Sequence, residues 1–535
     1  MRIRIWSILA LFVFSALVTG SAHAQQQQDF ETAVAGLNAR SFSAKQQAVE
    51  AVVQTAHPRA AAVLDAMLDR RLYVRREDNK VVIVAPAQAG FMLVDASTGT
   101  DLGAVEQRTV KRISTNNRLR SALRTGLAKL NLGDPSADVR LAAVGQIIDN
   151  FDETSAALLQ EAAEQEQDAQ IRELMEIGVA LGGLNAADPE QRMAAVATMK
   201  GSVNPEVRNR LTTLLESEQD ERVIKAVNSA LAAIQDRLNR FALIETIFFG
   251  LSLGSVLFLA AIGLAITFGV MGVINMAHGE LIMLGAYTTY LIQLLLPNYI
   301  DWSLLLAVPA AFIVSGLFGI AIERGVIRFL YGRPLETLLA TFGISLVLQQ
   351  LVRTTISAQN VPVANPSWMS GSWEINSALS LTLNRLYILL FALLVFAALQ
   401  LILKKTSLGL QVRAVSQNRN MAKAIGIRAE WVDAMTFGLG AGIAGVAGVA
   451  LSQLTNVGPN LGQSYIIDSF MVVVFGGVGN LWGTLVGAMS LGVGNKFLEP
   501  YSGAVLAKIL VLVFIILFIQ KRPRGLFAQR GRAAT

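Results

Sequence analysis

Cysteine is absent from the 535 residues, which excludes a disulfide framework, a thiolate metal site and a cysteine nucleophile. Charged residues make up only 16% of the chain, below the roughly one quarter that soluble proteins usually have. Histidine occurs three times, and no group of His and acidic residues has the spacing of metal ligands. The sequence therefore indicates neither a metal site nor a catalytic residue.

Motifs for nucleotide chemistry are missing as well. No Gly-Lys dipeptide occurs, so the chain lacks the Gly-x-x-x-x-Gly-Lys phosphate loop, and ATP with its Mg²⁺ would have to be bound by another subunit. No cofactor is expected in this chain. The net charge is +6, but the basic residues lie between apolar runs and at the C-terminus, a pattern typical of membrane orientation rather than nucleic-acid binding.

Apolar residues are abundant, at 53% of the chain, and they are unevenly placed. Residues 25–240 are rich in Glu, Gln, Arg and Asp, whereas residues 241–520 hold long apolar runs. This difference predicts one region in water and one in a lipid bilayer. The fold class expected is an all-α polytopic membrane protein with a mainly helical N-terminal domain.

The first 24 residues have the pattern of a signal peptide. Arg2 and Arg4 precede an apolar stretch over 5–18, and Ala22-His23-Ala24 is a small-residue cleavage site. The apolar stretch is shorter than the roughly 20 residues that a spanning helix needs, although an uncleaved first membrane helix is the alternative. Cleavage would export the domain over 25–240.

The exported region combines helices with a short β segment. Residues 29–71 have helical periodicity, residues 72–110 alternate as a small β meander, and helices return over 117–236. Several of the later helices carry an Arg near their start and small apolar residues on one face, as in Arg140, Arg172, Arg192 and Arg208. This pattern predicts HEAT-like helical repeats, with a plain helical bundle as the alternative.

The membrane region contains nine apolar spans, some short and interrupted by Gly, so that broken or re-entrant helices are plausible. They run over 243–271, 281–296, 303–322, 336–353, 386–402, 432–453, 465–479, 482–498 and 505–519.

Basic residues concentrate in three segments, over 323–335, 403–431 and the tail 521–535. The positive-inside rule places these in the cytoplasm. Three spans precede the first basic segment, so residue 240 should lie outside, in agreement with export by the signal peptide. Four spans separate the second segment from the tail, an even number, as two cytoplasmic ends require.

Within the segment 403–431, the residues from Leu410 to Ile425 are compatible with a helix, which would end at Gly426. A short cytoplasmic helix between spans is what a permease needs to dock on an ATPase, although an ordinary basic loop is the alternative. Its sequence resembles the coupling segment of the branched-chain amino acid ABC permease family. The matching residues are Leu408, Gly409, Arg413, Ala414, Val415, Gln417, Asn418, Ala422, Gly426 and Ile427.

Two further stretches carry the same resemblance. Residues 250–287 are similar to the family's first span with its Asn-x-Ala-His-Gly signature, here Asn275 to Gly279, and residues 472–488 are similar to its Gly-rich last segments. The resemblance implies the permease subunit of an ATP-driven importer in a bacterial inner membrane. It also implies a second homologous permease subunit, two ABC ATPase subunits, a periplasmic substrate-binding protein and surrounding lipid as partners.

The exported domain departs from ordinary family members, which begin almost directly at the first span. This architecture resembles permeases of urea ABC transporters and so implies urea as the substrate, with a branched-chain amino acid or another amide as the alternative. Urea is neutral and needs only hydrogen-bonding groups, whereas a zwitterionic amino acid would favour paired charges or helix termini.

The candidate pathway residues come from two places. Asn275, His278 and Glu280 either form a break in a membrane helix that lines the pathway or an interfacial turn with a helix cap. Gly476, Gly477 and Gly479 either permit close helix packing or line the pathway.

Two other classes of membrane protein fit the sequence less well. A stand-alone channel would not explain the coupling-like segment, and a membrane receptor would not need so many spans.

Overall fold

The computed structural model describes residues 26–87, 90–151, 155–376 and 378–527. The predicted signal peptide over 1–24 lies outside these residues. The chain divides into two compact units, a first unit up to Arg237 and a second unit from Leu238 onward.

The first unit opens with helices and a five-stranded sheet. A helix over 26–36 is followed by α2 (Phe42–Gln54) and α3 (Ala60–Leu68). The strands are β1 (Leu72–Arg75), β2 (Val81–Ala87), β3 (Gly90–Asp95), β4 (Asp101–Val105) and β5 (Val110–Arg112). They pair antiparallel in the order β4-β3-β2-β1-β5, so the first four form the predicted meander and β5 returns to pair with β1.

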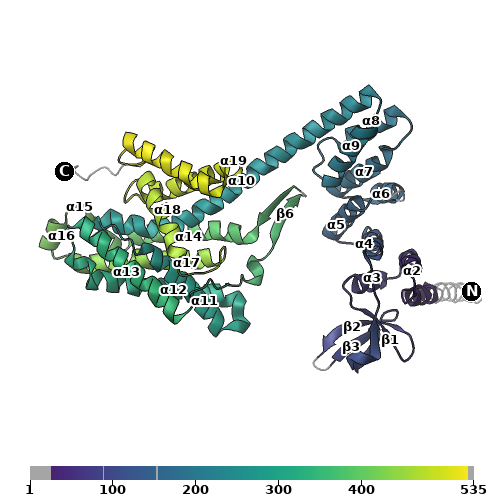
Figure 1. Ribbon diagram of the computed structural model, residues 1–535, viewed down its shortest axis with the longest axis horizontal. Coiled ribbons are helices and arrows are strands. Elements are labelled where there is room, and N and C mark those ends of the chain that lie inside the picture. The colour runs from purple at the N-terminus through teal and green to yellow at the C-terminus, as the bar shows by residue number, and fades with distance from the viewer. Residues whose placement is uncertain (1–25, 88–89, 152–154, 377, 528–535) are drawn as a thin grey trace, which may run out of the picture. The chain divides into compact units, whose positions relative to one another are not determined.

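Six helices follow the sheet, and Figure 1 shows them succeeding one another as a stack. They are α4 (Asn117–Asn131), α5 (Ala137–Asp149), α6 (Ser155–Gln165), α7 (Ala169–Gly183), α8 (Pro189–Met199) and α9 (Pro205–Ser217). Side-chain caps at Asn116, Asp168, Asp188 and Asn204 accept hydrogen bonds from the first free N–H groups of four of these helices.

These helices repeat with a shift of 52 residues. Arg140 binds Glu166 through two hydrogen bonds of 2.8 and 3.0 Å, and Arg192 binds Glu218 in the same way at 2.7 and 2.9 Å. Both arginines also donate to two backbone carbonyls of the turn before their own helix. The repeat therefore consists of three helices, and α4 to α6 form its first copy and α7 to α9 its second. One Arg–Glu pair lies within each copy.

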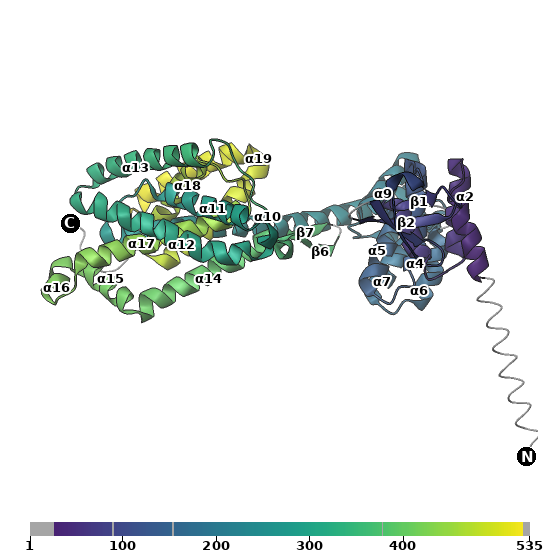
Figure 2. The same cartoon turned by 90° about the horizontal axis from the view of Figure 1, so that it is seen from below.

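Helix α10 (Glu221–Met271) belongs to the first unit up to Arg237 and to the second unit beyond it. The second unit continues with α11 (His278–Leu295), α12 (Ile300–Gly325), α13 (Pro334–Thr355), α14 (Leu383–Lys405), α15 (Ser407–Gln417), α16 (Arg419–Ala424), α17 (Ala429–Ser452), α18 (Leu461–Gly476) and α19 (Leu481–Lys521). Figure 2 shows these helices packed along one another, with α15 and α16 at one end.

Among the described residues, six helices are long and apolar enough to cross a membrane. Helix α18 is apolar but shorter, and α19 contains two of the predicted spans joined at Gly503, whose φ of 77° breaks the helix. A hairpin of β6 (Ser372–Asn376) and β7 (Leu379–Thr382) lies between the predicted spans 336–353 and 386–402, where no strand is predicted.

Glycine allows the central helices to approach closely. A Cβ on Gly285 of α11 would collide with the backbone of Gly445 in α17, and a Cβ on Gly448 would collide with the backbone of Ile282. Helix α17 also packs along α12, where Gly319 faces Ala441. Since lipid gives helices no hydrophobic reason to associate, close contact between small residues is the main source of their packing energy.

Candidate functional site: a charged cavity and the helical segment 403–431

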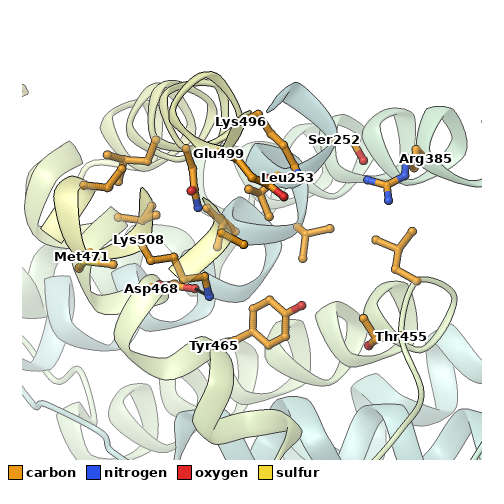
Figure 3. Close-up of a pocket in the computed structure, with 18 residues that line it drawn as sticks. Ser252, Leu253, Arg385, Thr455, Tyr465, Asp468, Met471, Lys496, Glu499 and Lys508 are labelled. Atoms are coloured by element: carbon orange, nitrogen blue, oxygen red, sulfur yellow. Dashed lines mark hydrogen bonds and ion pairs between the residues drawn. The ribbon is translucent and has the colours of Figure 1, made fainter. Parts of the chain in front are cut away.

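A cavity of about 300 Å³ lies inside the second unit, between α10, α14, α18 and the two halves of α19. Figure 3 shows its lining. Its polar residues are Ser252, Arg385, Thr455, Tyr465, Asp468, Asn495, Lys496, Glu499 and Lys508. The remaining wall is apolar and includes Leu253, Val256, Leu257, Met471, Leu491 and Val511. None of the site residues predicted from the sequence lines this cavity, because its residues come from spans far apart in the chain.

Two ion pairs lie in the cavity wall. The Lys508 ammonium is 3.0 Å from the Asp468 carboxylate and joins the second half of α19 to α18. The Lys496 ammonium is 2.6 Å from the Glu499 carboxylate within the first half of α19. Figure 3 shows the Tyr465 ring reaching into the cavity between the Asp468–Lys508 pair and Arg385. The lining thus offers both signs of charge and a phenol beside an apolar wall.

The break predicted around Asn275 is present between α10 and α11. Asn275, His278 and Glu280 are buried inside the second unit. The Met276 N–H donates to Thr341 Oγ1 at 3.1 Å, and Thr341 lies inside α13 rather than at its end. The break therefore lies beside Thr341, the eighth residue of the 22-residue helix α13.

Each of the three polar residues at the break makes at least one side-chain hydrogen bond. His278 Nε2 is 2.8 Å from the carbonyl of Ala260, and Asn275 Oδ1 accepts from the Ala277 N–H at 3.0 Å. Glu280 Oε1 accepts hydrogen bonds from Ser345 at 2.9 Å and from Gln349 at 2.7 Å, both on α13. Asn275 Nδ2, His278 Nδ1 and Glu280 Oε2 have no hydrogen-bond partner among the described residues.

Helix α18 also begins beside this break. A Cβ on Gly279 would lie 2.7 Å from the carbonyl carbon of Gly462, and a Cβ on Gly462 would likewise collide with the carbonyl of Gly279. The N-termini of α11 and α18 therefore meet through two glycines. Helix N-termini carry partial positive charge, and the buried Glu280 lies in the first turn of α11 at this crossing.

The three C-terminal candidate glycines form a tight turn. Gly477 and Gly479 have positive φ of 105° and 77° between α18 and α19, and the Gly476 carbonyl accepts from the Phe527 N–H at 3.1 Å. None of the three lines the charged cavity. The structure thus fits the packing interpretation of these glycines, which also bring residues 526–527 against the turn.

The segment 403–431 forms two helices, α15 and α16, where the sequence predicts one helix from Leu410 to Ile425. Asn418 interrupts it with an extended backbone and caps α16 by accepting from the Met421 N–H at 3.0 Å. An Asn side chain competes with helical hydrogen bonds in this way and favours a cap over a helix interior. Gly426, which has a φ of 93°, lies two residues after the end of α16.

Most of the ten predicted coupling residues maintain the shape of this segment. Leu408, Ala414, Val415, Ala422 and Ile427 join one apolar cluster with Val412 and Val432. Gly409 packs against the backbone of Leu403, and Arg413 donates to the Leu403 carbonyl. Gln417 is exposed. On α15, on α16 and directly after α16, the large apolar side chains that face outward are instead Leu410, Met421 and Ile425, none of which is among the ten.

Long apolar helices packed along one another define the second unit as that of a multi-pass membrane protein. A family model described as "Branched-chain amino acid transport system / permease component" matches residues 246–519. The chain belongs to this family of ABC transporter permease components, and it is a transport subunit rather than an enzyme.

The similar curated proteins are permeases of this kind. The high-affinity branched-chain amino acid permease LivH of Salmonella typhimurium is 31% identical over 296 residues, 54% of this chain and 96% of that protein. The permease BraD of Pseudomonas aeruginosa is 31% identical over 52% of this chain and 94% of its own length. The ribose import permease RbsC of Haemophilus influenzae is 24% identical over 48% of this chain. No solved structure matches the chain.

Proposed function

We propose that this chain forms the solute pathway of an ATP-driven importer, with the charged cavity as the entrance and the segment 403–431 as the contact for the ATPase. The observation that supports this most directly is the placement of the two features at opposite ends of the same helices. Arg385 lies at the start of α14, whereas α15 follows its end. Thr455 follows the end of α17, whereas α16 precedes its start.

The basic residues indicate which end faces the cytoplasm. The segments 323–335 and 403–431 and the tail from Lys521 are all basic, and the tail contacts the α18–α19 turn through the Leu526 N–H and the Phe475 carbonyl, 2.9 Å apart. The cavity then faces the periplasm, where a substrate-binding protein would deliver the solute. The first unit would also be periplasmic, and its helical repeat would help to dock the binding protein.

The remaining components follow from membership of the family. Two ATPase subunits would bind ATP and Mg²⁺, and a second, related permease chain would complete the membrane part in the bacterial inner membrane. The exposed Leu410, Met421 and Ile425 would contact the ATPase, because large apolar side chains facing water mark interaction surfaces.

Urea is the substrate that we propose first. The support is the first unit, which the matched permeases of branched-chain amino acids do not cover, since the family model begins at residue 246. An exported domain of this size before the permease resembles urea transporters. Urea would need hydrogen bonds alone, which Tyr465, Thr455 and Asn495 could offer.

A branched-chain amino acid is the second candidate, and two observations favour it. The printed names of LivH and BraD describe permeases for branched-chain amino acids. The cavity also places ion pairs beside an apolar wall, which suits a zwitterion with an apolar side chain.

The experiment uses the complete transporter in proteoliposomes with ATP inside and the binding protein outside. Labelled urea and labelled leucine are supplied in separate assays. We expect ATP-dependent uptake of urea, and leucine uptake without urea uptake would replace urea by the second candidate. Uptake that persists in liposomes holding this chain alone would contradict the importer itself.

The ATPase contact is tested in the same system. Replacing Leu410, Met421 and Ile425 by Ser removes exposed apolar groups without touching the inner cluster, so the protein should insert normally and lose uptake. The control replaces Leu335, an apolar residue at the start of α13 that is more exposed than any of the three, by Ser. Normal coupled uptake in the triple variant would refute the proposed contact.

A further inference from the structure

One face of α13 carries a polar residue at every fourth position. The residues of this polar stripe are Thr337, Thr341, Ser345, Gln349 and Arg353. The first four are at most 3% exposed, whereas the large apolar residues Leu339, Leu346 and Leu351 of the same helix face outward. Since residues four apart lie on the same side of a helix, α13 turns the polar stripe toward the protein and an apolar face toward lipid.

The polar stripe meets the break between α10 and α11. The Ser345 hydroxyl donates to Glu280 Oε1 at 2.9 Å, and Gln349 Nε2 donates to the same oxygen at 2.7 Å. Ser345 is the twelfth of the 22 residues of α13, so the Glu280 carboxylate lies beside the middle of that helix. Arg353, at the far end of the stripe, donates at 2.7 Å to Asn460, which directly precedes α18. The stripe therefore contacts the start of both α11 and α18.

One oxygen of the Glu280 carboxylate accepts no hydrogen bond. Glu280 is 1% exposed, and its Oε2 atom has no hydrogen-bond partner among the described residues. A buried carboxylate oxygen without a donor carries a desolvation cost, which a bound N–H group would remove. Ser345 and Gln349 hold the carboxylate through Oε1 and leave Oε2 free for such a donor.

The two sides of α11 are joined to their neighbours by different contacts. Toward α17, Gly285 packs directly on the backbone of Gly445, and such a contact leaves no space for a solute. Toward α13, hydrogen bonds connect Met276 with Thr341 and Glu280 with the polar stripe. Water or a solute with N–H groups can replace these hydrogen bonds, because it offers equivalent donors and acceptors. The side of α11 that faces α13 can therefore open without leaving polar groups unpaired.

We propose that the Glu280 carboxylate and the polar stripe form a binding site for the transported solute, which donates an N–H group to Glu280 Oε2. This inference rests on the proposed function. It applies to the amide groups of urea and to the ammonium group of an amino acid, because both are N–H donors. Ser345 and Gln349 are positioning residues, since they orient the carboxylate. The site opens when α13 moves away from α11, and the solute then replaces the contacts between these helices.

Helix α18 borders both this site and the charged cavity. Its second residue, Gly462, meets Gly279 beside Glu280. Tyr465 and Asp468, within the next two turns of α18, line the cavity. In this arrangement the cavity receives the solute first, and the Glu280 site then holds it beside the middle of α13.

The first test measures whether water and solute reach the polar stripe. Because the chain has no cysteine, Ser345→Cys and Leu346→Cys introduce single thiols at adjacent positions, one on the stripe and one on the outer face of α13. The complete transporter in proteoliposomes is exposed to the small cationic thiol reagent 2-aminoethyl methanethiosulfonate during ATP hydrolysis. We expect Ser345→Cys to react about tenfold faster than Leu346→Cys, since the reactive thiolate forms in water and not in lipid. Urea and leucine are added in separate assays, and the one that is transported should slow the reaction.

The second test measures uptake and ATP hydrolysis in the complete transporter. Glu280→Gln keeps the size of the side chain and an oxygen for Ser345 and Gln349, but it replaces the free acceptor by an NH₂ donor. We expect uptake to fall by about tenfold with normal insertion, while ATP hydrolysis changes less, because the motor does not contact this site. The matched control is Thr289→Val, which removes a buried hydroxyl of α11 whose hydrogen bond stays within that helix, and it should transport normally.

The outcomes separate this inference from the proposed function. An unreactive Ser345→Cys, a reaction that neither urea nor leucine slows, or full uptake in Glu280→Gln overturns the Glu280 site while the importer stands. If Glu280→Gln fails to insert, the reactivity of Ser345→Cys decides. Loss of ATP dependence in the unmodified protein, or coupled uptake in the Leu410, Met421 and Ile425 triple variant, overturns the proposed function instead.

Discussion

The two units of this chain stabilise packed helices by different means. In the first unit, short helices are held by side-chain caps and by arginines that bind both a glutamate and backbone carbonyls, as Arg140 and Arg192 do. In the second unit, the closest helix contacts are glycine against backbone, as at Gly285 and Gly448. The Arg–Glu pairs of the first unit are largely buried and satisfy one another by hydrogen bonds, whereas the glycine contacts of the second unit need no polar partner.

Charged side chains therefore indicate a structural role in the first unit and a candidate functional role in the second. An Arg–Glu pair in the first unit is a repeated structural element that recurs with its helices. In the second unit, a buried carboxylate such as Glu280, Glu323 or Asp433 is costly wherever it lies and marks a candidate for function. The comparison teaches that the same residue types should be interpreted by the solvent around them. The following predictions test that difference.

The largest effect is expected at the crossing of α11 and α17. Gly285→Ala places a methyl group against the backbone of Gly445, which cannot move aside as a flexible side chain could. We expect a loss of about 3 kcal/mol in stability, at the upper end for overpacking, seen as a loss of monodisperse protein in detergent. The control is Gly343→Ala on α13, where an added Cβ meets nothing within 4 Å. Equal yields of the two variants would contradict glycine packing.

The Asp468–Lys508 ion pair in the cavity wall should affect transport more than folding. Lys508→Met leaves the Asp468 carboxylate without its partner at 3.0 Å, and we expect uptake to fall by about tenfold, with normal insertion. The double variant Lys508→Met with Asp468→Asn removes both charges. If the double variant transports normally, the pair is structural and does not serve the solute. The control is Lys521→Met at the end of α19.

The Arg–Glu pairs should have a smaller effect, confined to the first unit. Arg192→Met removes the bonds to Glu218 and to two turn carbonyls, and we expect hydrogen exchange in α8 and α9 to become faster. Arg140→Met should have the same effect on α5 and α6, because the contacts are equivalent. Arg210→Met breaks only an exposed pair with Glu206 and should change little. Uptake driven by ATP should persist more fully than in the cavity variants.

The smallest expected effect is a pH dependence of the stability of the first unit. The hydrogen bonds from Arg140 lower the pKa of Glu166 from 4.5 to about 2. A carboxyl whose pKa is lowered by folding contributes stability that is full above pH 4.5 and is lost as the pH falls toward 2. Digestion by pepsin across this range should show protection of the first unit decreasing with pH. Glu166→Gln should be less protected at pH 5 and should show a weaker dependence below it.

Much of the architecture was predictable from local patterns. The β meander over 72–110, the return of helices at Asn117 and the division of the chain near residue 240 all follow from hydrophobic periodicity and composition. The apolar spans correspond to helices for the same reason. The hairpin of β6 and β7 was missed because its strands are short and lie between two spans, where no period is long enough to detect.

The amino-acid sequence by itself determined the solvent of each region, the order of the helices and the membership of a permease family, because these depend on composition and on neighbouring residues. Only the tertiary structure decided the rest. It brought Asp468 to Lys508 across forty positions of the chain and Arg419 to Asp433 and Tyr331, and it placed the break at Asn275 beside Thr341 of α13. Such contacts depend on how helices cross, and helix crossing is set by the packing of many side chains at once rather than by any local pattern.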